Sequence, residues 1–162
     1  MLSLGSNLGD REQNLRNALA DLADLDGVEL AGASSLYETP ALGLSGVDET
    51  KPAYLNAVVG VVTTLSPAEL LAATAGIETR HGRVREMRWG DRTLDIDIVS
   101  FGERRQSDAG LTLPHPRAHE RAFVLVPWLE IDPDAILPGI GRVDALPAAS
   151  ESVSRYPAEA LS

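Results

Sequence analysis

The segment at residues 93–99 has the sequence TLDIDIV, in which apolar and acidic residues alternate. Successive side chains of a β-strand point to opposite faces, so this period of two predicts a strand with one buried face. The buried face would carry Leu94, Ile96 and Ile98. Asp95 and Asp97 would share the other face, roughly 6–7 Å apart along the strand. Because two neighbouring carboxylates repel each other, we expect a positive group between them.

Two carboxylates at this spacing can lean together and bind Mg²⁺. Carboxylate oxygens are the hard ligands that Mg²⁺ prefers, and water and substrate phosphates usually complete its coordination. Two metal ions that share one such site lie roughly 3.5–4 Å apart. A D-x-D pattern also occurs by chance on solvated strand faces. The strand alone therefore leaves two interpretations open, a magnesium site and a solvated face.

A basic segment precedes this strand. Five of the 14 Lys and Arg residues lie close together in it: Arg80, Arg83, Arg85, Arg88 and Arg92. The guanidinium fork fits phosphate oxygens, so arginines beside a carboxylate pair indicate a bound polyphosphate. The arginines could instead neutralise nearby acids, namely Glu86, Asp91, Asp95 and Asp97. The chain has no G-x-x-x-x-G-K motif, and GSNLGD at residues 5–10 indicates a turn, so metal and arginine would have to bind a nucleotide.

A histidine and several aromatic residues are candidates for ligand contacts. His115 lies between two prolines in LPHPR; a lone histidine is commonly structural, but beside a phosphate clamp it could donate to a phosphate oxygen. Tyr54, Trp89 and Phe123 lie beside polar segments, where flat rings could stack on a planar heterocycle or simply pack in the core. Asn56 would share the strand face of Tyr54 and could offer a donor and an acceptor to a ring edge.

The order of the predicted elements indicates an α+β fold. Strands are expected at residues 1–4, 28–39, 54–65 and 93–101, and helices that begin after Asp10 and Ser66, with Gly27 as a stop for the first. A third helix is expected within residues 111–131, where Pro127 should end or kink it. This β-α-β-β-α-β order is the ferredoxin-like pattern, an antiparallel sheet with flanking helices mainly on one face and here an extra C-terminal helical segment.

Length, charge and composition favour one domain with small-molecule partners. The chain fits a single domain at residues 1–162, with a core at residues 2–147 and a mobile tail at residues 148–162. A net charge of −10 argues against nucleic acid or an anionic membrane as a partner. The chain has no cysteine, no signal-peptide pattern and no apolar run near the roughly 20 residues of a membrane span. We expect a cytoplasmic monomer.

Several motifs together resemble a known enzyme family. LGSNLGD, YETPALG, YLNAV, GRVREMRWGDRTLDIDI and LPHPRAHERAFVLVPWLEI, in this order, are similar to the 6-hydroxymethyl-7,8-dihydropterin pyrophosphokinases of folate biosynthesis. The resemblance covers residues 2–133, and residues 83–98 are its most specific part. It implies transfer of a diphosphoryl group from ATP to the pterin hydroxymethyl group, with release of AMP. We expect loops at residues 40–53 and 81–92 to close over both substrates.

The resemblance also implies roles for individual residues. It implies two Mg²⁺ ions on Asp95 and Asp97, with Arg83 and Arg92 binding the triphosphate and assisting transfer. Further ATP-binding positions are implied at Leu71, Glu78, Arg85, Ile98, Thr112, His115 and Arg121. The implied pterin pocket consists of Thr39, Pro40, Leu42, Tyr54, Asn56, Trp89 and Phe123. In it, Tyr54 and Phe123 would stack on the pterin while the Asn56 amide reads its edge.

The chain departs from the family pattern, and two other functions compete. Ala75 stands where family members often have Gln, Pro116 where some carry an aromatic residue, and the loop after ALG is longer than in compact members. The competing functions are another Mg²⁺-dependent transferase or hydrolase of this fold and a non-catalytic ligand-sensing domain. Only the pterin function needs Tyr54, Asn56 and Phe123 in one pocket, and a sensing domain has little use for paired aspartates beside arginines.

Overall fold

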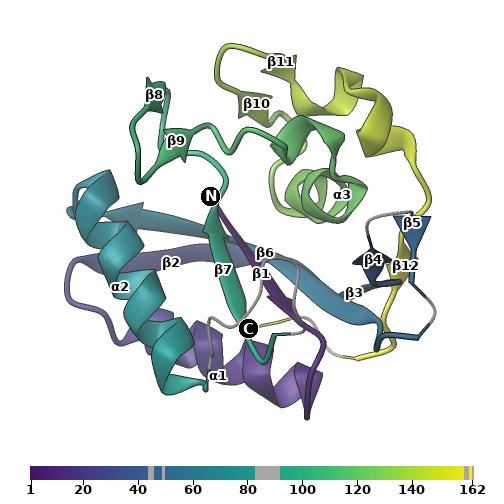
Figure 1. Ribbon diagram of the computed structural model, residues 1–162. Coiled ribbons are helices and arrows are strands. Elements are labelled where there is room, and N and C mark those ends of the chain that lie inside the picture. The colour runs from purple at the N-terminus through teal and green to yellow at the C-terminus, as the bar shows by residue number, and fades with distance from the viewer. Residues whose placement is uncertain (44–45, 49, 83–91, 159–160, 162) are drawn as a thin grey trace.

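The computed structural model describes residues 1–43, 46–48, 50–82, 92–158 and 161, and every structural statement below concerns these residues. Its main sheet has six strands in antiparallel pairs (Figure 1). Five of them follow the order β12-β3-β6-β1-β7, and β2 also pairs with β6. The strands are β1 (Leu2–Ser6), β2 (Val28–Ala33), β3 (Tyr37–Thr39), β6 (Tyr54–Thr63), β7 (Asp95–Ile98) and β12 (Ser154–Arg155). The protein thus has the mixed α and β structure that we predicted.

The first three strands differ from the sequence prediction in their lengths. β1 extends through Gly5 to Ser6, so the glycine that we assigned to a turn lies in the strand. The single strand expected at residues 28–39 is two strands, β2 and β3, which follow each other along the same edge of β6. The break between them is held by Ser34, whose Oγ accepts from the Val58 N–H at 2.9 Å. The Ser34 N–H also donates to Val58 O at 2.9 Å, so this residue stays bonded to β6 between the two strands.

Helices α1 (Arg11–Ala23) and α2 (Pro67–Arg80) begin at the predicted caps. The Asp10 carboxylate accepts from the Gln13 N–H at 3.0 Å. Ser66 and Glu69 form a capping box, in which each side chain accepts from the other residue's backbone N–H. Helix α1 ends at Ala23, earlier than the predicted stop at Gly27.

Both helices pack on one face of the sheet and bury the larger core with it (Figure 1). Apolar side chains from alternate positions of three central strands fill this core, among them Leu2, Leu4, Leu55, Ala57, Val59, Ile96 and Ile98. The helices contribute Leu15, Ala18, Leu19, Leu22, Leu70 and Ile77. The period of two predicted for residues 93–99 is therefore confirmed, since Ile96 and Ile98 are buried in this core while the intervening aspartates are not.

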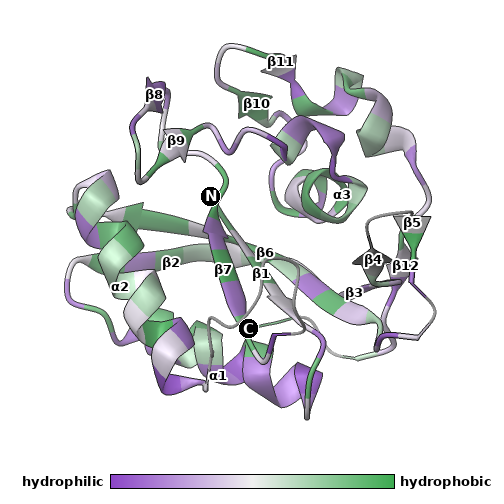
Figure 2. Ribbon diagram, in the orientation of Figure 1, coloured by the Kyte–Doolittle hydropathy of each residue, from purple (hydrophilic) through white to green (hydrophobic). Residues whose placement is uncertain are grey.

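Helix α3 (Ala122–Ile131), part of the expected extra C-terminal helical segment, covers part of the opposite face (Figure 1). Val58 of β6 points to this side and packs with Val124, Leu125 and Trp128 in a second core. Figure 2 shows that α3 is hydrophobic around most of its circumference. Pro127 was predicted to end or kink this helix; it lies inside α3 and does not end it.

Short elements complete the structure. They are the hairpins β4 (Leu42–Gly43)–β5 (Gly46–Val47), β8 (Gln106–Ser107)–β9 (Thr112–Leu113) and β10 (Ile136–Leu137)–β11 (Gly141–Arg142), and the 3₁₀ helices η1 (Ala118–Glu120), η2 (Val143–Ala145) and η3 (Pro147–Ser150). Beyond η3 the chain continues to β12, and Leu161 is buried in the larger core. Within the ranges given above, no helix is long and apolar enough to cross a membrane.

Candidate active site

The two aspartates of β7 lie on the sheet face away from the larger core. Asp95 and Asp97 are both half-buried, and the alternate side chains between and after them are buried. In the register with β1, Asp95 is opposite Gly5 and Asp97 is opposite Ser3. The residues beside the aspartates are therefore small. Helix α3 covers only part of this face (Figure 1).

One cross-strand row runs from the aspartates across the sheet. Gly5 pairs with Asp95 on one side and with Asn56 on the other, and Asn56 in turn pairs with Tyr37. Neighbouring strands lie about 4.8 Å apart, so Asp95 and Asn56 are about 10 Å apart along this row. A Cβ atom at Gly5 would lie 3.4 Å from Asn56 Oδ1 and 3.8 Å from Tyr54 Cδ1. The glycine keeps the space between the carboxylate and the amide open.

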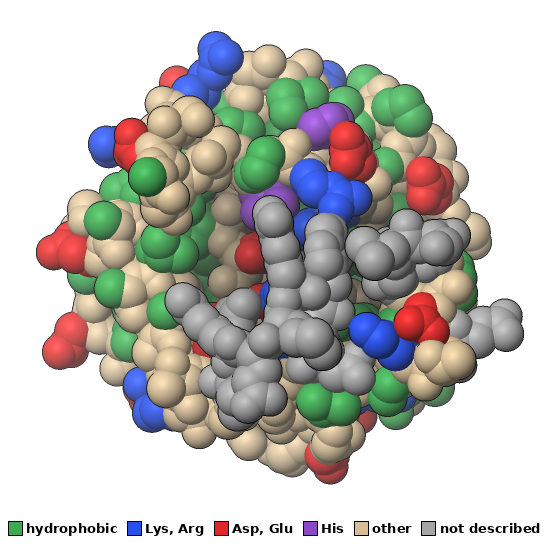
Figure 3. Space-filling model, in the orientation of Figure 1, with side chains coloured by type: hydrophobic (Ala, Val, Ile, Leu, Met, Phe, Trp, Pro, Cys, Tyr) green, Lys and Arg blue, Asp and Glu red, His purple; other side chains and the backbone are tan. Residues whose placement is uncertain are grey.

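Each aspartate is paired with an arginine. Arg92 Nη1 lies 2.7 Å from Asp95 Oδ1. Arg121, at the start of α3, donates from Nη1 to Asp97 Oδ2 at 3.1 Å. The positive groups expected beside the carboxylates are therefore guanidinium groups in this structure. Figure 3 shows that acidic, basic and histidine side chains gather near the middle of this face of the molecule.

His115 lies beside Asp97, with its Nε2 facing the carboxylate. Its Nε2 lies 3.7 Å from Asp97 Oδ2, and its Nδ1 accepts from the Arg117 N–H at 3.1 Å. Burial lowers the pKa of His115 below its ordinary value, although the charge of Asp97 opposes this shift. Because Nδ1 accepts a hydrogen bond, the neutral ring carries its proton on Nε2, which faces the aspartate. The backbone N–H of His115 donates to Val99 O at 2.8 Å and fixes the segment against the end of β7.

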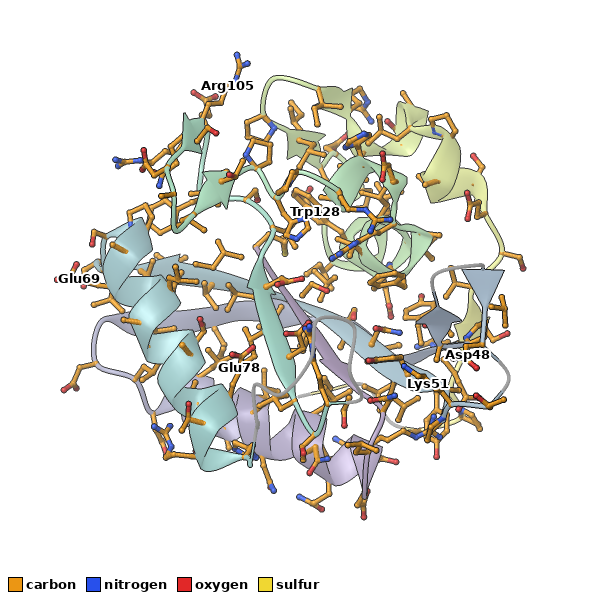
Figure 4. The ribbon with its side chains drawn as sticks, in the orientation of Figure 1. Asp48, Lys51, Glu69, Glu78, Arg105 and Trp128 are labelled. Atoms are coloured by element: carbon orange, nitrogen blue, oxygen red, sulfur yellow. The ribbon has the colours of Figure 1, made fainter. Side chains whose placement is uncertain are left out.

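Glu78 holds the outer edge of β7 in place. This α2 residue is 4% exposed, and its Oε1 accepts from the Ile96 N–H at 2.7 Å. Figure 4 shows Glu78 pointing from α2 into the molecule. Ile96 is the residue between the two aspartates, so the carboxylate of Glu78 fixes the backbone that carries both of them. The resemblance placed Glu78 near ATP, and the structure adds this contact with the strand.

Asn7 ties two loops to the end of β1, a role that the sequence analysis missed. Its Oδ1 accepts from the Arg92 N–H at 2.7 Å, and its own N–H donates to Arg92 O at 3.0 Å. Its Nδ2 donates to Pro52 O at 3.3 Å. Asn7 is 1% exposed. The only local signal was an asparagine after a glycine and a serine, which is equally typical of a turn.

Three of the residues implied for a pterin pocket, Thr39, Tyr54 and Asn56, lie at the other end of the cross-strand row. Asn56 is 4% exposed, and its Nδ2 donates to Thr39 Oγ1 at 2.9 Å and to Tyr37 O at 3.4 Å. Thr39 pairs with Tyr54 in the register of β3 and β6. The ring centroid of Phe123 lies 5.6 Å from Arg121 Cζ, in a cation–π contact.

Other candidate residues are spread more widely. Ile98 is 3% exposed in the larger core, Leu71 packs against that core from α2, and Thr112 lies in β9 opposite Ser107. Pro40 is exposed, and Leu42 lies in β4 with its side chain outside the described atoms. Arg83, Arg85, Arg88 and Trp89 lie outside the described residues. Most of the expected closing loop at residues 81–92 lies there too.

The carboxylate pair fits magnesium if the substrate completes the coordination. Among the residues described, no group of three or more His, Cys, Asp or Glu side chains could hold a metal ion. Mg²⁺ is usually bound by one or two carboxylates together with waters and substrate phosphates, and Asp95 and Asp97 supply such a pair on one face. The chemistry of the donors therefore suits a metal that arrives with a phosphate ligand.

Comparisons with known proteins point to the same chemistry. A family model described as 7,8-dihydro-6-hydroxymethylpterin-pyrophosphokinase (HPPK) matches residues 1–133. The chain is 42% identical over 142 residues to a 2-amino-4-hydroxy-6-hydroxymethyldihydropteridine pyrophosphokinase of Synechocystis sp., a match that covers 88% of this chain and 70% of that protein. Proteins of the same name are 44% identical over 138 residues in Methylorubrum extorquens, with 85% of each chain covered, and 45% identical over 130 residues in Bacillus subtilis, with 80% and 75% covered.

Proposed function

The chain belongs to the 7,8-dihydro-6-hydroxymethylpterin-pyrophosphokinase family, and from this premise we propose how its own residues carry out the reaction. It is a pyrophosphokinase of folate biosynthesis that uses ATP as co-substrate. The reaction moves the β- and γ-phosphoryl groups together. The hydroxymethyl oxygen of the pterin forms a bond to the β-phosphorus, the bond from that phosphorus to the α-phosphate oxygen breaks, and AMP leaves.

One observation carries the assignment of the site. The cross-strand row places the carboxylate of Asp95 and the amide of Asn56 on one face, with only Gly5 between them. The polyphosphate would bind at the carboxylate end of this row and the pterin at the amide end. The pterin hydroxymethyl group would then lie between them, over the glycine. When both substrates are bound side by side in this arrangement, a reaction between two separate molecules becomes a reaction within one complex.

Asp95 and Asp97 would bind two Mg²⁺ ions, which when present neutralise charge on the phosphate oxygens. Arg92 and Arg121 contact these carboxylates in the structure, and both are long enough to turn to the phosphate oxygens when ATP binds. Arg83 and Arg85 are proposed to add to this clamp. His115 would donate from Nε2 to a phosphate oxygen, which its neutral state allows.

The pterin would bind between Tyr54 and Phe123, with its ring edge at the Asn56 amide. The Thr39 hydroxyl orients that amide, because it accepts from Asn56 Nδ2. Pro40, Leu42 and Trp89 are proposed to complete the pocket, and Leu71, Ile98 and Thr112 to contact the nucleoside of ATP. Glu78 contributes to ATP binding by holding the strand that carries the aspartates.

We propose that the fold is ferredoxin-like. The order β7-β1-β6-β2, with helices between the first and second and between the third and fourth strands in sequence, supports the ferredoxin-like topology. We propose that residues 1–162 form a single domain that works as a cytoplasmic monomer. The net charge of −10 and the small-molecule substrates are consistent with this.

An assay for AMP tests the proposal. ATP, Mg²⁺ and 6-hydroxymethyl-7,8-dihydropterin are mixed with the protein, and each is omitted in turn. We expect AMP only when all three are present. ADP in place of AMP would mean attack at the γ-phosphorus and would contradict the proposed geometry. AMP formed without the pterin would show that water, not the hydroxymethyl group, is the acceptor.

A further inference from the structure

A short C-terminal segment lies against the strand that orients Asn56. Residues 154–156, here called the strap, contain β12, which pairs antiparallel with β3. Ser154 is opposite Glu38, Arg155 is opposite Tyr37, and the Tyr156 N–H donates to Leu36 O at 2.8 Å. The family model ends at residue 133, so the strap lies beyond the part of the chain that it matches.

The side chain of Arg155 joins three elements. It donates from Nη2 to Ser35 Oγ, and the same nitrogen lies 3.5 Å from Glu130 Oε1. Glu130, on α3, accepts from the Ser35 N–H at 3.0 Å, from Ser35 Oγ at 2.6 Å and from the Tyr37 hydroxyl at 3.1 Å. Arg155 therefore places a positive charge beside the carboxylate of Glu130, which already accepts three hydrogen bonds from residues at or just before the start of β3.

Tyr156 gives the strap a second point of attachment. Its ring centroid lies 6.0 Å from Arg11 Cζ. Arg11 Nη1 contacts Glu38 Oε1 at 2.7 Å and donates to Ala53 O at 2.8 Å. Ala53 immediately precedes Tyr54, one of the residues proposed to stack on the pterin. The strap is thus linked through Arg11 to the residue that precedes Tyr54, and through Glu130 to Tyr37 in β3.

The strand between the strap and the pocket is short. β3 has three residues, and a strand of that length on a sheet edge is marginal in isolation. The strap pairs with its outer edge, while β6 pairs with its inner edge. Two atoms of β3, Tyr37 O and Thr39 Oγ1, accept from the Asn56 amide. A displacement of β3 would therefore change the direction of that amide.

We propose that the strap, through Arg155, is a positioning element for the pterin pocket and sets the affinity for the planar heterocycle. This role rests on the proposed function of Asn56. Arg155 acts through β3 and touches no reacting group, so it is a positioning residue. The aspartates are on β7, which β1 and β6 separate from β3. Loss of the strap contacts should therefore affect the pterin and leave ATP binding unchanged.

Steady-state kinetics of Arg155→Ala, Arg155→Lys and the matched control Arg142→Ala test this role. Arg142 also pairs with carboxylates, but in the β10–β11 hairpin away from β3. We expect Arg155→Ala to raise the KM for the pterin about fivefold, with the KM for ATP and kcat unchanged. Arg155→Lys keeps the positive charge but not the guanidinium fork. Its KM for the pterin should therefore lie between those of the parent and of Arg155→Ala. Arg142→Ala should match the parent.

Hydrogen exchange measures whether Arg155 stabilises β3, independently of whether the protein forms AMP. The amides of residues 36–39 should exchange faster in Arg155→Ala than in the parent and in Arg142→Ala. An unchanged KM for the pterin would overturn the proposal, whatever the exchange rates. A fall in kcat or a rise in the KM for ATP equal to the effect on the pterin would also overturn it, since the role would then be general stability. A parent that forms no AMP would instead contradict the proposed function itself.

Discussion

Single residues show how two neighbouring carboxylates are accommodated on one strand. Asp95 and Asp97 each contact an arginine, Arg92 at 2.7 Å and Arg121 at 3.1 Å. These ion pairs offset the repulsion between the carboxylates. A dication that binds there must share the carboxylate oxygens with the arginines or displace them. Metal binding is therefore expected to depend on phosphates that give the arginines a new partner.

The substitution Asp97→Asn tests the metal role with almost no change of shape. It removes one anionic ligand and leaves the half-buried side chain able to accept from Arg121. We expect AMP formation to fall by about a hundredfold or more, with the melting temperature near that of the parent. The matched control is Asp134→Asn, because the Asp134 side chain is 88% exposed. Turnover within a few-fold of the parent in Asp97→Asn would contradict the metal role.

The buried carboxylate of Glu78 fixes the backbone of β7 between the two aspartates. In Glu78→Ala the Ile96 N–H loses its partner at the edge of β7. We expect the free energy of unfolding to fall by about 1–3 kcal/mol, the usual cost of an unsatisfied buried donor. Glu78→Gln retains an acceptor and should lose less. Urea denaturation of both variants measures the difference, and equal losses would show that the hydrogen bond to Ile96 is not what matters.

At the scale of elements, the site also depends on a position in β1 that carries no side chain. Gly5 lies between the carboxylate of Asp95 and the amide of Asn56, and a side chain there would enter the space above the row. The substitution Gly5→Val suits a strand but adds a branched group 3.4 Å from Asn56 Oδ1 at its Cβ. We expect the KM for the pterin to rise about tenfold.

The control for this substitution is Gly32→Val in β2. A Cβ at Gly32 would have no atom within 4 Å, so the added group meets open space. We expect its kinetics to match those of the parent. If both valine variants raised the KM for the pterin alike, the effect would come from the sheet as a whole and not from the space beside Asn56.

The sequence predicted the elements whose signals are local. The period of two around Asp95 and the helix start after Ser66 each depend on residues within a few positions of one another, and the structure confirms both. The break between β2 and β3 could not be predicted, because Ser34 bonds to Val58, 24 residues away. The role of Asn7 was missed for the same reason, since its partner Arg92 is 85 residues away. Such bonds depend on which strands become neighbours.

At the scale of the whole molecule, one face of the sheet buries the larger core and the other face carries the two aspartates. Helices α1 and α2 cover one face and bury the larger core, which gives the strands a fixed register. Helix α3 covers part of the other face, and its first turn brings Arg121 and Phe123 to the edge of the exposed part. Two of the three α-helices lie on one face, and α3 lies on the other because it is apolar around most of its surface and requires burial of its own (Figure 2).

The measurement that tests the carboxylate site most directly is electron paramagnetic resonance of bound Mn²⁺, which replaces Mg²⁺ at oxygen ligands. The protein is titrated with Mn²⁺ in the presence of an ATP analogue that cannot be cleaved between its α- and β-phosphates. We predict about two bound ions per chain in the parent and fewer in Asp95→Asn and Asp97→Asn. Equal binding in the parent and in both variants would contradict a metal site on these two aspartates.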